Sequence, residues 1–266
     1  MRMPYFKREK TPGPPHRLDK YGLLSYKESL LALQKALHNE KISYGLYDLM
    51  RGLLAQGSVA DFPAGEGINY TYLIKNTLDS NTVKNSLIEL GNQIPEKADL
   101  IFGIQNSGIV LANVIGFHTR KRVETIFKAT EANYKHDPVF GVVIDSYTHG
   151  IKNVLSLDPV LFQRWKPASS RRAVRIAFVD DICDTGTLLC AVSELMKNIS
   201  RHLHTNLKIV RMMTLFEKTH TNSRMRLKKE IGMNLVSVVK IEDMGQKPHS
   251  WIKIKGINKA LSFAHS

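Results

Sequence analysis

Three carboxylates and two hydroxyls lie within eight residues near the middle of the chain: Asp180-Asp181-Ile-Cys-Asp184-Thr185-Gly186-Thr187. Adjacent carboxylates suit sugar hydroxyls or a metal ion, because ionised carboxylates only accept hydrogen bonds and repel phosphate. The Thr-Gly-Thr turn has the opposite preference, since its hydroxyls and closely approaching backbone suit a phosphate. The run predicts a ligand that carries both hydroxyls and phosphate. An ordinary strand-to-helix turn with a capping Asp or Thr is the alternative.

Two elements must position these groups. The apolar run 176–179 predicts a buried strand before the acidic pair. Apolar residues then recur at helical spacing from Leu188 to Ile199. In an open α/β sheet, ligands bind beyond the carboxyl ends of the strands, and a helix N-terminus favours anions. The order of strand, carboxylates, turn and helix therefore fits a ligand site.

The run resembles the phosphoribosyl-pyrophosphate (PRPP) signature of type I phosphoribosyltransferases, in its purine-salvage form. The matching residues are Asp180, Asp181, Asp184, Thr185 and Gly186. The resemblance implies that the acidic pair holds the ribose hydroxyls and that Thr185, Gly186 and Thr187 hold the 5′-phosphate. It also implies that Asp184 exchanges a proton with purine N7 as a general acid/base. The family usually has a second Thr two places after the glycine, where this chain has Leu188.

A second strand, turn and helix precede this run. Residues 100–104 predict a strand, and residues 109–117 predict a helix. The turn between them contains Asn106, Ser107 and Gly108. The resemblance implies that this turn binds the pyrophosphate of PRPP through backbone N–H groups. The family usually has two glycines there.

Two further strands are predicted over 123–127 and 140–144, followed by a polar loop of about 25 residues that reaches Arg172. We also expect a short helix near 159–165 within it. A connection of that length favours a lid or a binding loop. The resemblance implies that Ser146 and Tyr147 belong to a mobile loop that excludes water from the reaction.

The C-terminal part predicts a strand over 207–218 and another over 235–241. The resemblance implies that Lys218 donates to the 6-oxo group of a purine; a surface lysine at a strand end is the alternative. It also implies that Trp251 stacks on the base and that the backbone at Ile252 reads its edge, whereas a Trp that closes a core is the competing interpretation. The family usually continues with a magnesium-binding acidic residue, which residues 253–258 lack.

Residues 1–20 are basic and rich in proline, which predicts a flexible or extended arm. Helices are expected over 25–38, where Ser25 and Glu28 form a capping-box pattern, and over 43–56. We assign 1–76 to a basic arm and helical extension, and 77–266 to a phosphoribosyltransferase-like domain. The extension fits a packing or dimerisation element better than a helix-turn-helix unit, because no recognition helix can be identified.

The chain of 266 residues has a formal net charge of +14, and residues 201–266 hold 13 Lys and Arg against 4 Asp and Glu. Because a small anionic substrate needs only a few cations, this excess points to a nucleic-acid partner. Scattered lysines that only solubilise the fold explain it equally well. Two cysteines without a disulfide framework indicate a reducing compartment. No apolar run is long enough for a bilayer. We therefore expect a cytoplasmic homo-oligomer without a membrane partner.

These observations predict an α/β fold with a mostly parallel sheet of the type I phosphoribosyltransferase kind, a small C-terminal hood and the N-terminal extension. The resemblance implies Mg²⁺-dependent phosphoribosyl transfer between PRPP and a 6-oxopurine base, releasing pyrophosphate, with Asp180 and Asp181 as metal ligands. One alternative is an effector or regulator that uses this fold while bound to nucleic acid, with altered or lost salvage activity. Another is a PRPP-using enzyme whose acceptor is a nucleotide or a nucleic-acid end.

Overall fold

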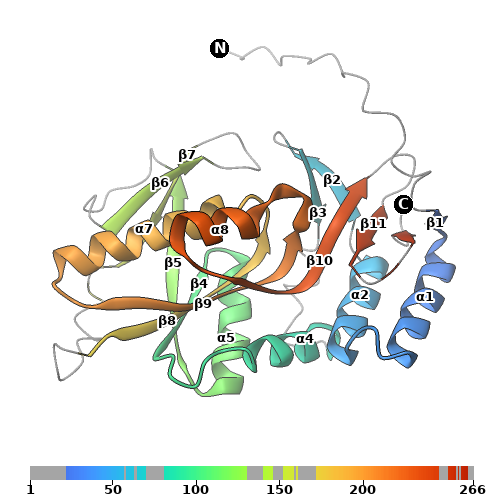
Figure 1. Cartoon of the computed structure of the whole chain (residues 1–266), viewed down its shortest axis with the longest axis horizontal. Helices are drawn as coiled ribbons and strands as arrows, with labels where there is room; N and C mark the ends of the chain where they lie inside the picture. The colour runs from blue at the N-terminus through green and yellow to red at the C-terminus, as the bar shows by residue number, and fades with distance from the viewer. Residues whose placement is uncertain are drawn as a thin grey trace, which may run out of the picture.

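The fold was analysed in a computed structural model of the whole chain (Figure 1). The structure describes residues 22–56, 58–62, 65–69, 81–130, 140–145, 152–158, 160, 172–245, 251–255, 257 and 259–262. All structural statements below refer to these residues.

A ten-stranded sheet forms the centre of the protein, in the order β1-β12-β11-β10-β9-β8-β4-β5-β7-β6. Its five central strands run parallel to one another. They are β4 (Leu100–Ile104), β5 (Arg122–Thr130), β8 (Val174–Cys183), β9 (Leu207–Lys218) and β10 (Leu235–Gly245). The predicted α/β fold with a mostly parallel sheet is confirmed.

Antiparallel strands extend the sheet on both sides. At one edge lie β6 (Gly141–Asp145) and β7 (Lys152–Ser156), and β7 pairs with β5. Beyond β10 lie β11 (Trp251–Ile254) and β12 (Ala260–Ser262), which form the C-terminal hood. The hairpin of β2 (Ser58–Phe62) and β3 (Gly65–Asn69) forms a separate two-stranded sheet.

Helices cover both faces of the parallel strands, so that the fold has three layers (Figure 1). The helices are α1 (Tyr26–His38), α2 (Tyr44–Gln56), α4 (Asn81–Gly91), α5 (Ser107–Thr119), α7 (Thr187–His202) and α8 (Ser223–Ile231), with a 3-10 turn, η4 (Thr219–Thr221). One apolar cluster joins α1, α2, α4 and α5 to the sheet, and a second cluster joins α7 and α8 to it.

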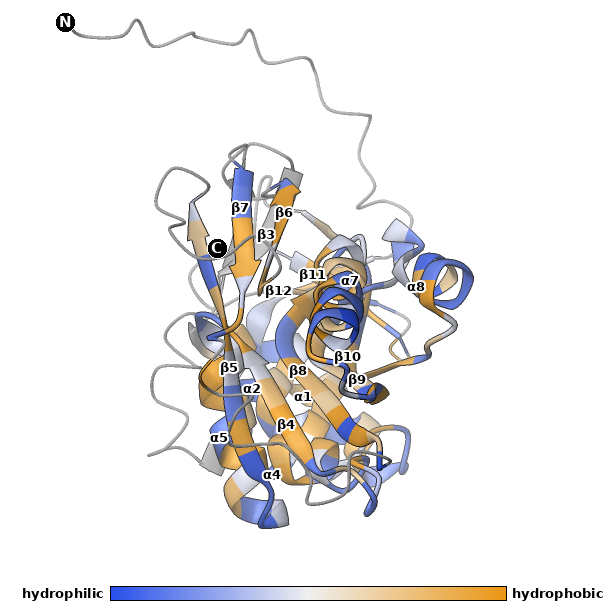
Figure 2. Ribbon diagram, turned by 90° about the vertical axis from the view of Figure 1, so that its left-hand side faces the viewer, coloured by the Kyte–Doolittle hydropathy of each residue, from blue (hydrophilic) through white to orange (hydrophobic). Residues whose placement is uncertain are grey.

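Strand β8 shows why both faces are covered. Successive side chains of a strand point to opposite faces. Accordingly, Ala177 and Val179 belong to the cluster that contains α5, whereas Ile176 and Phe178 belong to the cluster that contains α7. All four side chains are fully buried. The uninterrupted apolar runs of β4 and of residues 176–179 in β8 are therefore typical of a parallel sheet buried on both faces, and Figure 2 shows much of both strands in the hydrophobic colour.

The N-terminal helices share this core. Helix α1 begins after Ser25, whose side chain accepts from the Glu28 backbone N–H while the Glu28 side chain accepts from the Ser25 backbone, as the capping box predicts. Strand β1 (Leu23–Leu24) pairs with β12, and Leu33 lies in the same apolar cluster as residues of the sheet. The division of the chain at residue 76 stays a prediction, but residues 22–56 pack as part of the main core.

Two parts of the predicted element pattern are wrong. The segment after residue 145 was expected to be one long loop, but it contains β7. The sequence signal for this strand is weak, because it has only two large apolar side chains, Val154 and Leu155. No helix was expected between 218 and 235, yet α8 lies there. Helix α8 is so polar that it lacks an apolar stripe, and its single fully buried apolar residue is Leu227. Both elements depend on partners that are distant in sequence.

Candidate functional site

The order of the parallel strands locates the site. In space the order is β5-β4-β8-β9-β10, whereas the chain passes through β4, β5, β8, β9 and β10. The connections therefore leave β4 toward one side for β5 and return to its other side for β8. In open α/β sheets, ligands bind beyond the carboxyl ends of the strands at such a reversal point. The loops that follow β4 and β8 contain the two predicted PRPP-binding turns.

The acidic pair lies inside β8, which extends to Cys183 rather than ending at Val179. Asp180 is buried, and its Oδ1 accepts a hydrogen bond of 2.9 Å from the Asp181 backbone N–H. Asp181 is partly exposed, and its Oδ1 accepts from the Ile182 backbone N–H at 2.8 Å. Burial, and secondarily the neighbouring Asp181 charge, raise the pKa of Asp180 well above its ordinary value. The Asp181 backbone N–H and the charge of Lys128 compensate the ionised form only in part.

The turn after β4 packs directly against this pair. A Cβ atom added at Gly108 would lie 2.9 Å from the Val179 carbonyl oxygen and 3.0 Å from Asp180 Oδ1. A side chain at position 108 would therefore push this turn away from β8. Helix α5 begins at Ser107, two residues earlier than expected, so Asn106 is its exposed N-cap and Ser107 its first residue. The three predicted pyrophosphate-binding residues thus lie at a helix N-terminus beside the carboxylates.

The Thr-Gly-Thr turn forms the start of α7. Gly186 has φ +78° and ψ −2°, the left-handed conformation that glycine adopts without strain. Thr185 Oγ1 lies 2.8 Å from Thr187 Oγ1. The Thr187 backbone N–H also donates to Thr185 Oγ1, at 3.5 Å. The turn therefore offers two paired hydroxyls at the N-terminus of α7, which favours an anion.

Asp184 and Lys218 come together at the ends of β8 and β9. Lys218 Nζ lies 2.9 Å from Asp184 Oδ2, and the side chains are only 3% and 13% exposed. The single proton of the Thr221 hydroxyl is shared between the backbone carbonyls of Asp184 and Lys218, which links the two strand ends. Asp184 Oδ1 is buried and has no hydrogen-bond partner in the part of the chain that the structure describes. This oxygen can accept a proton or a hydrogen bond from a ligand.

Two predicted base-binding residues lie in the hood. Trp251 is buried, and its indole packs against Gly245, where an added Cβ would lie 2.7 Å from Trp251 Nε1. Ile252 is fully buried in the apolar cluster with Met244. Trp251 thus packs inside the hood, as the competing interpretation of this residue expects, and its stacking on a base stays a prediction. Ser146 and Tyr147 lie outside the described residues.

Magnesium fits the donor set of the acidic pair. Mg²⁺ prefers oxygen ligands and is commonly bound through one or two carboxylates together with substrate phosphates. Asp180 and Asp181 supply such carboxylates, and a bound cation would compensate the buried charge of Asp180. Within the described ranges, no group of three or more His, Cys, Asp or Glu side chains could hold a metal ion by itself. A magnesium ion here would therefore need oxygen ligands from the substrate.

Sequence reasoning missed Arg226, which α8 brings to the phosphate turn. Its Nη1 donates to Thr187 Oγ1 at 2.6 Å. It also missed the buried Glu217, to which Arg224 donates two hydrogen bonds of 2.6 and 2.7 Å. The sequence signal for α8 was Asn222-Ser223 followed by a strongly basic segment. This pattern is as typical of an exposed loop as of a helix.

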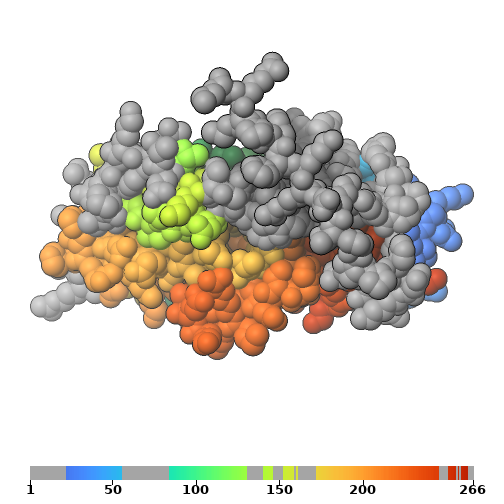
Figure 3. Space-filling model, turned by 90° about the horizontal axis from the view of Figure 1, so that it is seen from above, coloured from blue at the N-terminus to red at the C-terminus, as the bar shows by residue number. Residues whose placement is uncertain are grey.

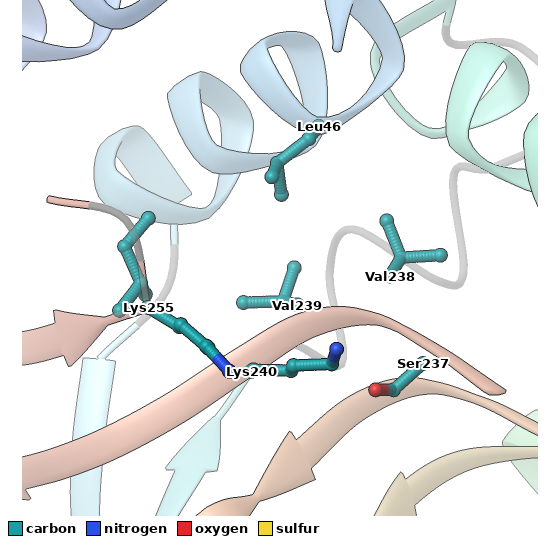
Figure 4. A pocket seen from close by; sticks show the side chains of 7 residues that line it. Leu46, Ser237, Val238, Val239, Lys240 and Lys255 are labelled. Atoms are coloured by element: carbon teal, nitrogen blue, oxygen red, sulfur yellow. The ribbon is translucent and has the colours of Figure 1, made fainter. Parts of the chain in front are cut away.

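A separate cavity of about 180 Å³ lies between α2 and β10 (Figure 4). Its described lining is Leu46, Ser237, Val238, Val239, Lys240, Ile254 and Lys255. This lining contains none of the predicted site residues, so the cavity is distinct from the site at the strand ends. No helix in the described ranges is both long and apolar enough to cross a membrane.

Comparison with known proteins identifies the fold. No protein-family model matches the sequence, and no curated protein matches it. The structure is similar to adenine phosphoribosyltransferase from Rhodothermus marinus, at 15% identity and a TM-score of 0.51, over 74% of this chain and 98% of that one. It is similar to the Giardia lamblia enzyme complexed with 9-deazaadenine, at 14% identity and a TM-score of 0.51, over 72% and 97%.

The Trypanosoma brucei adenine phosphoribosyltransferase, in complex with AMP, pyrophosphate and ribose-5-phosphate, gives the same result. It is 13% identical and has a TM-score of 0.50, over 74% of this chain and 80% of that one. At such identities the likeness establishes the fold. The chain therefore has the fold of phosphoribosyltransferases, in agreement with the strand order and with the position of the predicted turns.

Proposed function

We propose that this chain is a phosphoribosyltransferase that transfers the phosphoribosyl group between PRPP and a 6-oxopurine base and releases pyrophosphate. One observation carries the proposal. The turn at 106–108 and the acidic pair are more than 70 residues apart in sequence, yet they meet at the reversal point of the sheet, where Gly108 packs against Asp180 in β8. A likeness of short motifs alone would not require this contact.

The proposed roles follow from the chemistry of each group. Asp180 and Asp181 accept hydrogen bonds from the ribose hydroxyls and hold Mg²⁺ together with substrate oxygens. Bound magnesium would neutralise the charge that develops on the departing pyrophosphate. The backbone of Asn106, Ser107 and Gly108 binds pyrophosphate at the N-terminus of α5. Thr185, Gly186 and Thr187 bind the 5′-phosphate.

The Asp184–Lys218 pair supports the assignment of the base. An ammonium group has three donors and no acceptor, so Lys218 favours an exocyclic oxygen over an exocyclic amino group. The unpartnered Asp184 Oδ1 can exchange a proton with purine N7 while Oδ2 stays paired with Lys218. We propose that Trp251 stacks on the base at the hood side. The adenine named for the similar solved structures makes adenine the competing base.

The test is pyrophosphate release from Mg-PRPP with hypoxanthine, guanine, xanthine or adenine supplied in turn. We expect release with at least one of the three 6-oxopurines, and a decrease of about 10²- to 10⁴-fold in Asp184→Asn. Release with adenine alone would overturn the 6-oxopurine assignment and keep the transferase. No release with any base would overturn the proposed reaction.

A second candidate function is a nucleic-acid-bound effector with this fold. The observation in its favour is a set of exposed cations on two helices that pack together, Lys197 and Arg201 on α7 and Lys229 on α8. Binding to duplex and single-stranded nucleic acid should be measured from about 50 to 200 mM salt, because displaced counterions give a steep salt dependence. Absence of binding at the lowest salt would eliminate this candidate.

A further inference from the structure

Arg226 lies on α8, about 40 residues after the Thr-Gly-Thr turn at 185–187, and its side chain reaches that turn. Its Nη1 donates to Thr187 Oγ1 at 2.6 Å, and Thr187 Oγ1 lies 2.8 Å from Thr185 Oγ1. A guanidinium group and two hydroxyls therefore form a continuous hydrogen-bonded chain beside Gly186. All three groups can donate hydrogen bonds, and the guanidinium keeps its positive charge at any physiological pH.

The packing of α8 holds Arg226 in this place. A Cβ added at Gly186 would lie 3.4 Å from both Leu227 Cγ and the Ser223 backbone oxygen, so the first turns of α8 cover the glycine turn. Leu227 is fully buried. Arg224 forms a bidentate ion pair with the fully buried Glu217, which anchors the same helix to β9. Figure 3 shows α8 at the molecular surface beside α7.

The present acidic partner of Arg226 is easily exchanged. Arg226 Nε lies 2.9 Å from Glu230 Oε1, one helical turn away, and the two side chains are 40% and 43% exposed. Exposed pairs at this spacing contribute only about 0.3–0.5 kcal/mol. A phosphate dianion offers a guanidinium more charge and a matching bidentate geometry, and it would lie where the Thr hydroxyls and the N-terminus of α7 already favour an anion.

We propose that Arg226 is a further ligand of the 5′-phosphate, and that the phosphate displaces Glu230 as its ion-pair partner. This inference rests on the proposed function, because it assigns the Thr-Gly-Thr turn to the phosphate of a phosphoribosyl group. It deepens that function by naming a specificity-determining residue. The site then selects ribose that carries a 5′-phosphate, through a charged group supplied by α8.

The test compares two probes that separate the two halves of the site. Isothermal titration should measure the affinity for ribose 5-phosphate, which has the 5′-phosphate alone, and for magnesium pyrophosphate, which has none. For Arg226→Gln we expect ribose 5-phosphate to bind about 10- to 100-fold more weakly, as for a lost charge-assisted hydrogen bond. Pyrophosphate should bind unchanged. Arg226→Lys should recover part of the loss.

Two further variants sharpen the test. Lys228→Gln removes the same charge from an exposed position of α8 and should leave both affinities within about twofold. Glu230→Gln releases Arg226 and should tighten ribose 5-phosphate binding by about twofold, the size of an exposed helical ion pair. Thermal unfolding of each variant checks that the fold is retained.

The outcomes separate the inference from the function on which it rests. If wild-type protein binds both probes and Arg226→Gln binds ribose 5-phosphate as well or more tightly, Arg226 is not a phosphate ligand and the inference fails alone. If Arg226→Gln and Lys228→Gln weaken binding equally, the effect is general electrostatic attraction, and the inference also fails. If wild-type protein binds neither probe, the proposed function fails and the inference fails with it.

Discussion

Lys218 Nζ lies 2.9 Å from Asp184 Oδ2, and 34 residues of chain separate the two. They stand at the ends of adjacent parallel strands, with Lys218 almost fully buried. A buried ammonium group needs a counter-charge, so Asp184 explains how Lys218 can stay buried. The second Asp184 oxygen is buried and has no hydrogen-bond partner among the described residues.

Removing the cation of this pair should destabilise the protein. In Lys218→Met the Asp184 carboxylate loses its partner in a largely buried place, and we expect the free energy of unfolding to fall by about 3 kcal/mol. Lys218→Met/Asp184→Asn should recover part of this loss, because no unpaired charge remains. Urea unfolding of the single and double variants measures both values. Additive losses would show that the two side chains are not coupled.

Asp180→Asn should stabilise the ligand-free protein at neutral pH. Burial foremost, and the Asp181 charge next, raise the pKa of Asp180 above 3.8. Between that value and the raised pKa the folded state binds more protons than the unfolded state, so stability falls as pH rises through this window. The amide removes that cost, so we expect the variant to have a larger free energy of unfolding than the wild type at neutral pH.

The pH dependence provides the control for Asp180→Asn. Below about pH 4 the Asp180 carboxyl of the wild type is mostly protonated in the folded and in the unfolded state, and the amide of the variant is always neutral. The gain in stability over wild type should therefore disappear there. Unfolding by urea at pH 7.5 and at pH 4, without magnesium, measures the difference. An unchanged gain at both pH values would show that the carboxyl charge is not the cause. The same variant should lose PRPP binding, because it lacks the carboxylate that we propose as a magnesium ligand.

Gly186→Ala and Gly232→Ala form a matched pair. Both glycines are left-handed, with φ +78° and +68°, so each substitution should cost about 1–2 kcal/mol of stability. An added Cβ meets nothing within 4 Å at Gly232 but lies 3.4 Å from α8 atoms at Gly186. Only Gly186→Ala should also weaken ribose 5-phosphate binding. Equal binding by both variants, measured by calorimetry, would argue against the Thr-Gly-Thr turn as the phosphate site.

Both cysteines should resist alkylation in the folded protein. Burial foremost raises the pKa of Cys183 to about 12 and that of Cys190 to about 11. Because the thiolate is the reactive form, only about 0.1% of Cys190 is reactive at pH 8. We expect iodoacetamide at pH 8 to label neither residue in native protein and both in urea, as intact mass spectrometry would show. Rapid native labelling of Cys183 would contradict its burial.

The local pattern of the sequence was sufficient for most elements that carry the site. Residues 100–104 and 176–179 are apolar without interruption, as strands buried on both faces must be, and α7 follows the latter with a clear apolar stripe. Ser25 and Glu28 determine the start of α1 because a capping box needs only groups three residues apart. Such features depend on neighbours in the chain, so the sequence by itself determined them.

Contacts between distant segments were decided by the tertiary structure alone. The resemblance to a known family indicated Gly108, Asp180, Asp184 and Lys218 as site residues, but it did not show that they meet. The parallel register of β4, β8 and β9 brings them together. Strand β7 and helix α8 have little local signal in the sequence. Strand β7 depends on its pairing with β5 and β6. Helix α8 is positioned by the buried Glu217 and by the turn at Gly186. Arg226 therefore became visible only in three dimensions: its role depends on where α8 packs, and its own stretch of sequence does not specify that place.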